Sequence, residues 1–277
     1  MSKRQFIISA VAIPLVVALI GLIPWISEML SGSSSEPPPA DSVVKNHCLR
    51  FDGIDDYLEM RNGGHFDLAD ALTVEMWIRP LSLKKGNRGL IQGTQNQLGQ
   101  EGARLDNGWV LMFDVQHFWA LQVFTDETGS GIGVWADIEE DHWQHLAAVY
   151  DGSHVTLYHN GKKSGRREHT GGEVSDYTKI LIGTWAPRFK DGGCFHGLID
   201  EVRIWNLSRS EEEIASTMGS KLAAGTEGLI GYWDFDSGKG QTAYGKAGFK
   251  QDARLGFSPF GKDTSDPEWV LSDCPID

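Results

Sequence analysis

Three aspartates crowd one short turn near the start of the polar part of the chain. Asp52, Asp55 and Asp56 lie within five residues of one another, and Gly53 lies between them. A hard cation such as Ca²⁺ takes about six to eight oxygen ligands and mixes carboxylates with backbone carbonyls of tight turns. The spacing therefore predicts a calcium site with Asp52, Gly53, Asp55 and Asp56 as ligands. The alternative is a turn whose aspartates accept hydrogen bonds from backbone amides.

The other acidic clusters lack the spacing of a catalytic pair. Retaining glycosidases hold two carboxyls about 5 Å apart, commonly as Glu-x-Asp-x-x-Glu on one strand, and the sequence has no such motif. The acidic residues in 137–141 predict a solvated turn. Glu211–Glu213 predict the first turn of a helix, where the helix dipole favours negative charge. We therefore expect a protein that binds without cleaving, and a lyase built on His117 and Arg104 is an open alternative.

Two tryptophans share a strand face with charged side chains. In two segments apolar residues alternate with other residues at a period of two, which is typical of strands with one buried face. The face opposite the apolar residues carries Glu75, Trp77 and Arg79 in one segment and Glu201, Arg203 and Trp205 in the other. Aromatic rings beside hydrogen-bonding groups suit a sugar, so Trp77, Trp205, Glu75, Arg79 and Arg203 are predicted to bind a glycan. The alternatives are that these rings pack under loops, or that Trp119, Trp135 and Trp185 form the platform.

Short strands separated by turns must position these residues. Strands are expected at 49–53, 57–60, 72–79, 109–114, 118–124, 143–150, 155–159, 179–185, 195–206 and 228–236, whereas the tail from 251 to 277 offers only short apolar pieces such as 268–271. Turns every eight to twelve residues are typical of a β-sandwich, and Asn160-Gly161 is a strong hairpin signal. Ser210 and Glu213 have the spacing of a capping box and predict one short helix. The chain is therefore expected to be all-β with that single helix.

The N-terminal segment has the composition of a membrane anchor. Residues 1–5 carry two basic side chains and are expected to form a cytoplasmic tail, and the apolar run at 6–26 is long enough to cross a bilayer as a helix. A cleaved signal peptide is the alternative. Residues 27–46 predict a flexible Ser/Pro linker. The domain at 47–277 is then expected outside the cytoplasm, tethered by a single transmembrane helix.

Charge and cysteine content restrict the partners. A net charge of −13 argues against nucleic acid or an anionic lipid surface as the main partner. The three cysteines have no zinc-site spacing. Cys48 and Cys274 lie at the two ends of the predicted domain, and the termini of a domain are often close together. In an oxidising compartment we expect them to form a disulfide that leaves Cys194 free; three buried thiols are the alternative.

Five segments, in order, resemble the laminin-G-like (concanavalin A-like) jelly-roll domains. They are Leu49–Tyr57, Leu72–Pro80, the pair Trp143–Gly152 and Leu157–Gly161, Gly197–Asn206, and Gly228–Asp236. The resemblance covers about residues 47–272 and implies an antiparallel jelly-roll sandwich. It also implies bound Ca²⁺, with Asp200 in the strand beside the acidic turn as a further ligand that would pin the first strand to the closing one. One departure is Tyr244–Gly248, where the family often has Asp-x-x-Gly-Asn.

These features together predict a membrane-anchored, extracytoplasmic jelly-roll domain that binds a glycan or glycoconjugate without cleaving it. A cell-surface module that binds another protein is the main alternative. Exposed aromatic rings would favour a sugar as the partner, whereas a broad apolar patch would favour a protein. A polysaccharide hydrolase or lyase is a further alternative. The fold is shared by binding proteins and enzymes, so it does not decide among these functions.

Overall fold

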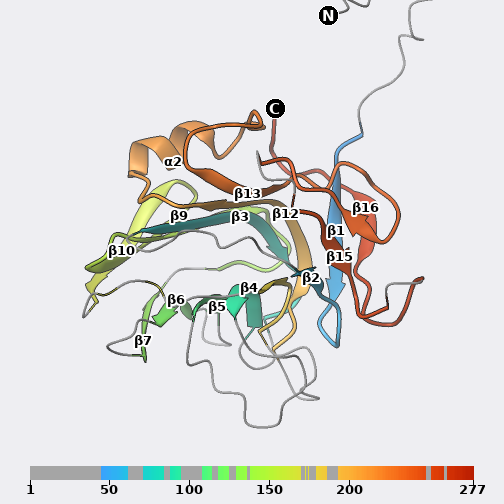
Figure 1. The fold of residues 1–277 in the computed structure, drawn as a ribbon, viewed down its shortest axis with the longest axis horizontal. Coiled ribbons are helices and arrows are strands. Elements are labelled where there is room, and N and C mark those ends of the chain that lie inside the picture. Colours follow the sequence, from blue (N-terminus) through green and yellow to red (C-terminus); the bar gives the residue numbers. More distant parts are fainter. Residues whose placement is uncertain are drawn as a thin grey trace, which may run out of the picture. The chain divides into compact units, whose positions relative to one another are not determined.

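Two antiparallel sheets face one another in the computed structural model of the chain (Figure 1). The structure describes residues 45–61, 71–83, 88–94, 108–113, 118–124, 129–135, 138–169, 172, 174, 179–185, 193–247, 251–258 and 261–277. Sheet A contains, in spatial order, β10 (Lys162–Glu168), β9 (His154–His159), β8 (Gln144–Tyr150), β3 (Leu72–Pro80), β12 (His196–Trp205), β1 (His47–Asp52) and β16 (Glu268–Leu271), and β13 (Leu229–Trp233) also pairs with β12. Sheet B contains β14 (Thr242–Ala243), β15 (Ala253–Leu255), β2 (Leu58–Arg61), β11 (Lys179–Ile182), β4 (Arg88–Thr94), β5 (Gly108–Phe113), β6 (Phe118–Phe124) and β7 (Gly129–Trp135).

The core lies between the inner faces of the two sheets. Sheet A contributes Leu49, Val74, Leu146 and Ile204, and sheet B contributes Leu58, Ile91, Leu121 and Ile180, among other residues of one cluster. Apolar side chains alternate with polar ones along the sheet A strands because only one face of the strand meets the other sheet. The all-β sandwich expected from the sequence is therefore confirmed. Trp119, one of the alternative platform rings, is a core residue with no exposed surface.

Strand β12 organises sheet A. It pairs with β3 along one side, and with β1 and then β13 along the other. A register shift between Asp200 and Arg203 marks a bulge, and Glu201 in that bulge has a φ of 52°. The extra residue changes the alternation, so Ile199 and Val202 both join the core. Beyond the bulge, Arg203 and Trp205 lie on the outer face of sheet A, the face turned away from sheet B.

A short helix covers part of that outer face. Helix α2 (Glu211–Thr217) begins at Ser210 with the predicted capping box, in which the Ser210 side chain accepts from the backbone of Glu213 and the Glu213 side chain accepts from that of Ser210. Its buried residue, Ile214, packs with Ala147, Val149 and Tyr158 of sheet A. Figure 1 shows α2 on the side of sheet A opposite β4, β5 and β6. We call helix α2 and the turn after it the lid, because they cover part of the outer face of sheet A.

The local turn signals are confirmed, whereas some strands have no counterpart in the prediction. Asn160 and Gly161 have φ values of 50° and 73° and form the turn between β9 and β10. Strands β4, β7, β14, β15 and β16 were not expected, and β10 was implied only by the Asn160-Gly161 turn before it. The predicted anchor at 6–26 and the linker before residue 45 lie outside the described residues. Within the part of the chain that the structure describes, no helix is long and apolar enough to cross a membrane.

Candidate functional site

The acidic turn, Asp52–Asp56, brings three carboxylates together at the end of β1. One oxygen from each of Asp52, Asp55 and Asp56 lies within 4.8 Å of the others. The same carboxylates also accept backbone hydrogen bonds within the turn: Asp52 Oδ1 accepts from the Ile54 amide at 2.7 Å, and Asp56 Oδ2 accepts from the Asp52 amide at 2.7 Å. The aspartates therefore shape the turn, as the alternative interpretation predicted, and the bound calcium stays a prediction.

Burial and neighbouring negative charges shift the pKa values of the acidic turn. Burial, and then the charges of Asp52, Asp55 and Asp266, raise the pKa of Asp56 to about 7, although the Asp52 amide opposes the shift. Burial also raises the pKa of Asp55, and the nearby charges of Asp52 and Asp263 add to it. Carboxylates that repel one another are the donor set a hard divalent cation prefers. The three facing carboxylates thus fit part of a calcium shell.

The C-terminal segment closes over the acidic turn. Thr264 Oγ1 donates to Asp55 Oδ2 at 3.1 Å, and the Tyr57 amide donates to the Ser265 carbonyl at 3.2 Å. Asp266 is buried, and its Oδ1 has no hydrogen-bond partner among the described residues. These contacts place two additional aspartates, Asp263 and Asp266, near the predicted site. Sequence reasoning missed them because they lie more than two hundred residues away along the chain.

Asp200 does not belong to this site, which corrects the expectation drawn from the family. In the β1–β12 pairing Asp52 lies opposite His196, and Asp200 is four residues farther along β12, about 13 Å at the usual rise per residue. Asp200 is fully buried, and its carboxylate accepts from Ser272 Oγ at 2.7 Å and from the Glu201 amide at 2.9 Å. Burial raises its pKa well above the ordinary range, and the Glu201 charge adds to this. Asp200 instead ties β12 to the end of β16.

Gly53 has a conformational role in the acidic turn. Its φ is +78°, and a Cβ at this position would lie 2.7 Å from the Cβ of His196. A larger residue would therefore be strained and would also clash with β12. Whether the Gly53 carbonyl is a calcium ligand stays a prediction.

The predicted tryptophan platform is wrong because helix α2 and the turn after it cover the outer face. Strand parity placed Trp77 and Trp205 on the correct face, opposite the core. However, Trp77 is 6% exposed and Trp205 is 2% exposed, while Glu75 and Arg203 are fully buried. The Trp77 indole donates to the Met218 carbonyl at 2.7 Å. These four residues hold the lid in place and are not available to a ligand.

Glu75 and Arg209 form the central ion pair under the lid. Arg209 Nη2 also donates to the Glu213 carbonyl and to Thr217 Oγ1, both at 2.9 Å, and its guanidinium lies 4.1 Å from the centroid of Trp205. His145 Nε2 lies 3.3 Å from the second Glu75 oxygen. Burial would raise the pKa of Glu75, but His145, Arg209 and Arg203 hold it below the ordinary range. Burial lowers the pKa of His145, although Glu75 opposes this shift.

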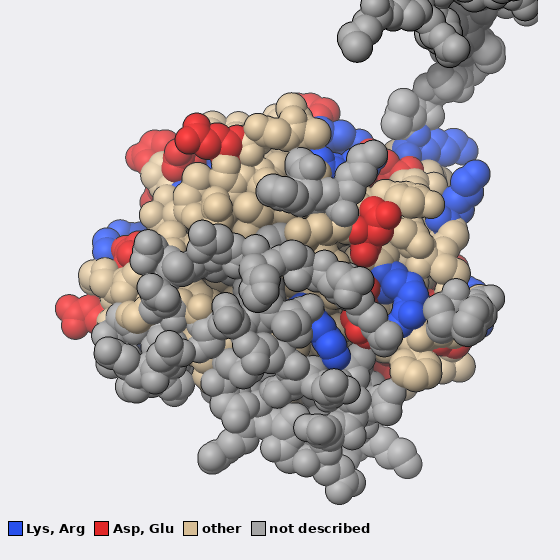
Figure 2. Space-filling model, viewed as in Figure 1, with Lys and Arg blue, Asp and Glu red and all other residues tan. Residues whose placement is uncertain are grey.

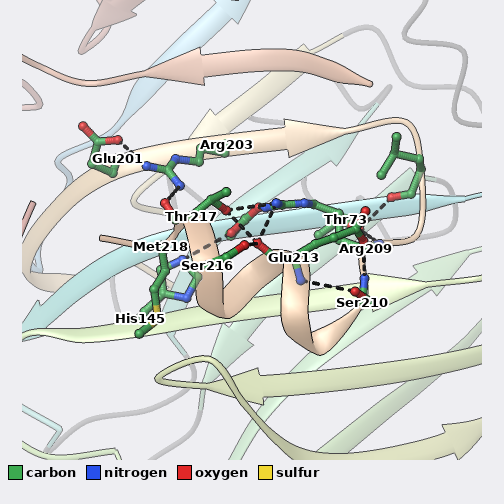
Figure 3. A network of polar contacts seen from close by, with 12 residues as sticks. Thr73, His145, Glu201, Arg203, Arg209, Ser210, Glu213, Ser216, Thr217 and Met218 are labelled. Atoms are coloured by element: carbon green, nitrogen blue, oxygen red, sulfur yellow. Dashed lines mark hydrogen bonds and ion pairs between the residues drawn. The ribbon is translucent and has the colours of Figure 1, made fainter. Parts of the chain in front are cut away.

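Arg203 binds the backbone at the C-terminal end of helix α2. Its guanidinium donates to the Thr217 carbonyl at 2.9 Å and to the Ser220 carbonyl at 2.7 Å, and it pairs with Glu201 at 2.7 Å. Tyr232 donates to the same Glu201 oxygen at 2.8 Å. A cation at the C-terminal end of a helix is favourable because the carbonyls there carry partial negative charge. Figure 3 shows that Arg203 and Arg209 both reach Thr217, at the C-terminal end of α2.

Arg79 is the predicted ligand residue that remains at the surface. It belongs to the Arg79 cluster, which we define as Arg79, Asp141, Trp143 and Asp273. Arg79 Nε donates to Asp141 at 2.9 Å and Nη1 lies 3.2 Å from Asp273, while the Trp143 indole donates to Asp273 at 2.7 Å. Hydrogen bonding to Asp141 raises the pKa of Arg79, and the Trp143 hydrogen bond lowers that of Asp273. The Trp143 residue is half-buried and both aspartates are exposed.

The cysteines are free and buried, so the predicted Cys48–Cys274 disulfide is not present in the structure. Hydrogen bonds between β1 and β16 join the two ends of the domain without a covalent bond. Burial raises the pKa of the Cys48 thiol to about 12. Burial also raises the pKa of Cys274, and the charges of Asp200 and Glu201 add to that shift.

Comparison with known proteins agrees with the two-sheet architecture. Residues 52–215, more than half of the chain, match Laminin_G_3, described as the concanavalin A-like lectin/glucanases superfamily. The chain belongs to this family. The resemblance noted in the sequence is thereby confirmed, and the family match ends inside α2. The acidic turn lies within the matched region, whereas the segment 263–266 that closes over it lies beyond.

Individual relatives of this concanavalin A-like chain are distant. Pappalysin-1 of Mus musculus is 26% identical over 205 residues, which are 69% of this chain and 12% of pappalysin-1, and the Homo sapiens protein is 26% identical over 204 residues. The chain thus spans about an eighth of the length of these relatives. A putative carbohydrate binding protein from Bacteroides ovatus has a TM-score of 0.61 at 18% identity, over 84% of this chain and 62% of that chain. This likeness shows the fold alone.

Proposed function

We propose that this domain binds a glycan or glycoconjugate outside the membrane without cleaving it, on a stalk formed by its N-terminal anchor and linker. The observation that carries the proposal is the Arg79 cluster, in which a half-buried indole lies beside a guanidinium and two exposed carboxylates. A sugar stacks its C–H face on an aromatic ring while its hydroxyls bond to polar neighbours. The Arg79 cluster offers both kinds of contact.

The backbone at the cluster supports this proposal. Asp141 has a φ of 61°, an uncommon conformation for a residue with a side chain. Its amide donates to the Pro80 carbonyl at 2.7 Å, which holds it against the end of β3 next to Arg79. Strained residues kept in place by their surroundings are concentrated at ligand sites. The cluster is also fixed from the far end of the chain through Asp273, so its geometry is set before a ligand arrives.

We further propose that the acidic turn binds Ca²⁺ in a structural role. Asp52, Asp55 and Asp56 would be the protein ligands, and water would complete the shell. Because the segment 263–266 is hydrogen-bonded to the turn, a cation there would fasten the C-terminal segment to β1. EDTA would then lower the melting temperature of the protein, and added calcium would restore it. A melting temperature unchanged by both reagents would overturn the calcium proposal.

A glycan array tests the main proposal. The full-length protein in detergent is compared with Trp143→Ala and Arg79→Gln, and Trp269→Ala serves as the matched control because Trp269 is a half-buried ring elsewhere on sheet A. We expect the first two variants to lose at least tenfold in affinity for the best glycan, while the control stays within about twofold. Equal binding by all four proteins would exclude the Arg79 cluster as the glycan site.

A protein partner is the second candidate function. The observation that favours it is the burial of Trp77 and Trp205, which removes the extended aromatic platform expected of a lectin. In that case the protein binds no glycan on the array, even in the presence of calcium. The same immobilised protein then retains a polypeptide partner through a surface that includes the Arg79 cluster, and Arg79→Gln weakens that complex.

A further inference from the structure

Strand β10 carries an unusual density of positive charge in an acidic protein. Four of the six residues from Lys162 to Arg167 are basic, although the whole chain has a net charge of −13. We call Lys162, Lys163, Arg166 and Arg167 the basic edge. All four side chains are exposed. Blue atoms lie at the left of Figure 2, where Figure 1 shows β10.

Most of this charge is not neutralised by neighbouring carboxylates. Arg166 pairs with Asp151 at 3.1 Å. Lys162, Lys163 and Arg167 have no ion pair within 4.0 Å among the described residues. The acidic first turn of α2 is a second source of negative charge near β10: burial and then the Glu211 charge raise the pKa of Tyr158, which lies opposite Lys163. Three of the four cations thus lack an ion-pair partner in the part of the chain that the structure describes.

The position of β10 in the sheet places these cations along an open rim. It is the last strand of sheet A and pairs with β9 on one side only. Lys163 lies opposite Tyr158, on the outer face, whereas Arg167 lies opposite Val155, on the core side. Side chains of the basic edge thus project to both sides of the rim. A linear ligand running along β10 would meet cations from both sides.

The same strand is poorly suited to pairing with a strand of another protein. A register shift between Lys163 and Gly165 marks a bulge. Bulges and lysines on an edge strand disfavour the addition of a further strand. Recognition at this rim must therefore use the side chains rather than the backbone, which favours a flexible polyanion over an extended peptide.

We propose that the basic edge binds an anionic polysaccharide, one that carries carboxylates or sulfates, alongside the Arg79 cluster. This inference rests on the proposed glycan-binding function and names the chemical class of the glycan. Guanidinium and ammonium groups bind such anions through charge-assisted hydrogen bonds. Exposed contacts of this kind are individually weak, so several must act together along the chain of the ligand.

The test measures binding of the full-length protein to immobilised heparin, polygalacturonate and neutral dextran. The test variant is Lys162→Gln/Lys163→Gln/Arg167→Gln. The control is Lys45→Gln/Arg50→Gln/Lys239→Gln, which removes three exposed cations elsewhere and changes the net charge equally. We expect tight binding to at least one polyanion, a loss of about tenfold in the test variant, less than twofold change in the control, and weakening of wild-type binding by added salt.

Several outcomes would overturn the inference. They are equal loss in both triple variants, dextran binding as tight as polyanion binding, or polyglutamate binding as tight as the polysaccharides. The Trp143→Ala variant separates this inference from the proposed function. If Trp143→Ala abolishes binding while the test variant binds normally, the proposed function stands and the basic edge is refuted. If the test variant loses binding while Trp143→Ala binds normally, the basic edge stands and the Arg79 cluster is excluded.

Discussion

Removing Arg209 should destabilise the domain far more than removing an exposed arginine. Glu75 is fully buried, and Arg209, itself 6% exposed, supplies its ion-pair partner. In Arg209→Met an apolar side chain of similar length replaces the methylene stem, whereas the charge and the guanidinium contact with Trp205 are lost. A buried carboxylate is then left with His145 at 3.3 Å as its neighbour. Breaking one side of a buried ion pair costs about 3–5 kcal/mol.

The helix also loses contacts in this variant. Arg209 donates to the Glu213 carbonyl and to Thr217 Oγ1, and each lost hydrogen bond to a charged group costs about 1.5–3 kcal/mol when the partner cannot be resolvated. Because Thr217 and Glu213 lie near the surface, water replaces most of this. We therefore expect a total loss of about 3–5 kcal/mol in the free energy of unfolding.

Urea denaturation at pH 8 measures this loss, with Arg166→Met as the matched control. Arg166 is 47% exposed and pairs with Asp151, so its removal should cost less than about 1 kcal/mol. The double variant Glu75→Gln/Arg209→Met should recover part of the stability, since no buried charge is left unpaired.

The pH dependence provides an independent readout. With Arg209 present, the pKa of Glu75 is low and the carboxylate contributes stability above pH 4.5, which is lost as the pH falls. Without Arg209, burial dominates and raises that pKa, so the variant should gain stability relative to wild type as the pH falls from 8 to 5. A deficit below 1 kcal/mol that does not change with pH would refute a dry, charged interface under α2.

Three other changes test separate parts of the structure. Asp56→Asn should stabilise the calcium-free protein at pH 8 by roughly 2–4 kcal/mol and should not stabilise it at pH 4. The reason is that the Asp56 pKa of about 7 makes the wild-type protein less stable as the pH rises through that value. In thermal melts, added calcium should protect only the wild-type protein. Gly183→Ala should cost about 2–5 kcal/mol in urea denaturation, since φ is +88° and the new Cβ would lie 2.2 Å from a Phe51 ring atom; a smaller loss would contradict this close packing. Peptide mapping after mild oxidation should find Cys48 joined to Cys274, and a Cys194 bridge would contradict that pairing.

Local patterns predicted local features well. The acidic turn is contained in five residues, so its carboxylates had to be close. Likewise, the capping box at Ser210 and the hairpin turn at Asn160 depend on neighbours in sequence, and both are confirmed. Strand β7 was missed because its sequence, GSGIGVW, is rich in glycine, which is a weak strand former.

Contacts between distant segments decided the features that sequence reasoning missed. Alternation gave the correct face for Trp77 and Trp205, but the cover over that face depends on Arg209 and Glu75, which are 134 residues apart. The Arg79 cluster similarly needs Asp273, 194 residues from Arg79. A single strand pattern states which side of a sheet a residue occupies and contains no information about what covers that side.

The meeting of the two ends of the domain has a consequence for how such a unit spreads among proteins. His47 of β1 lies opposite Leu271 of β16, and the Ser272 amide donates to the Asn46 carbonyl at 2.9 Å. A unit that begins and ends at one point can be inserted into a surface loop of another protein without separating the two sides of that loop. Transplanting residues 45–277 into a host loop should therefore leave both folds intact, and joining the two ends directly should permit new termini at the β9–β10 turn.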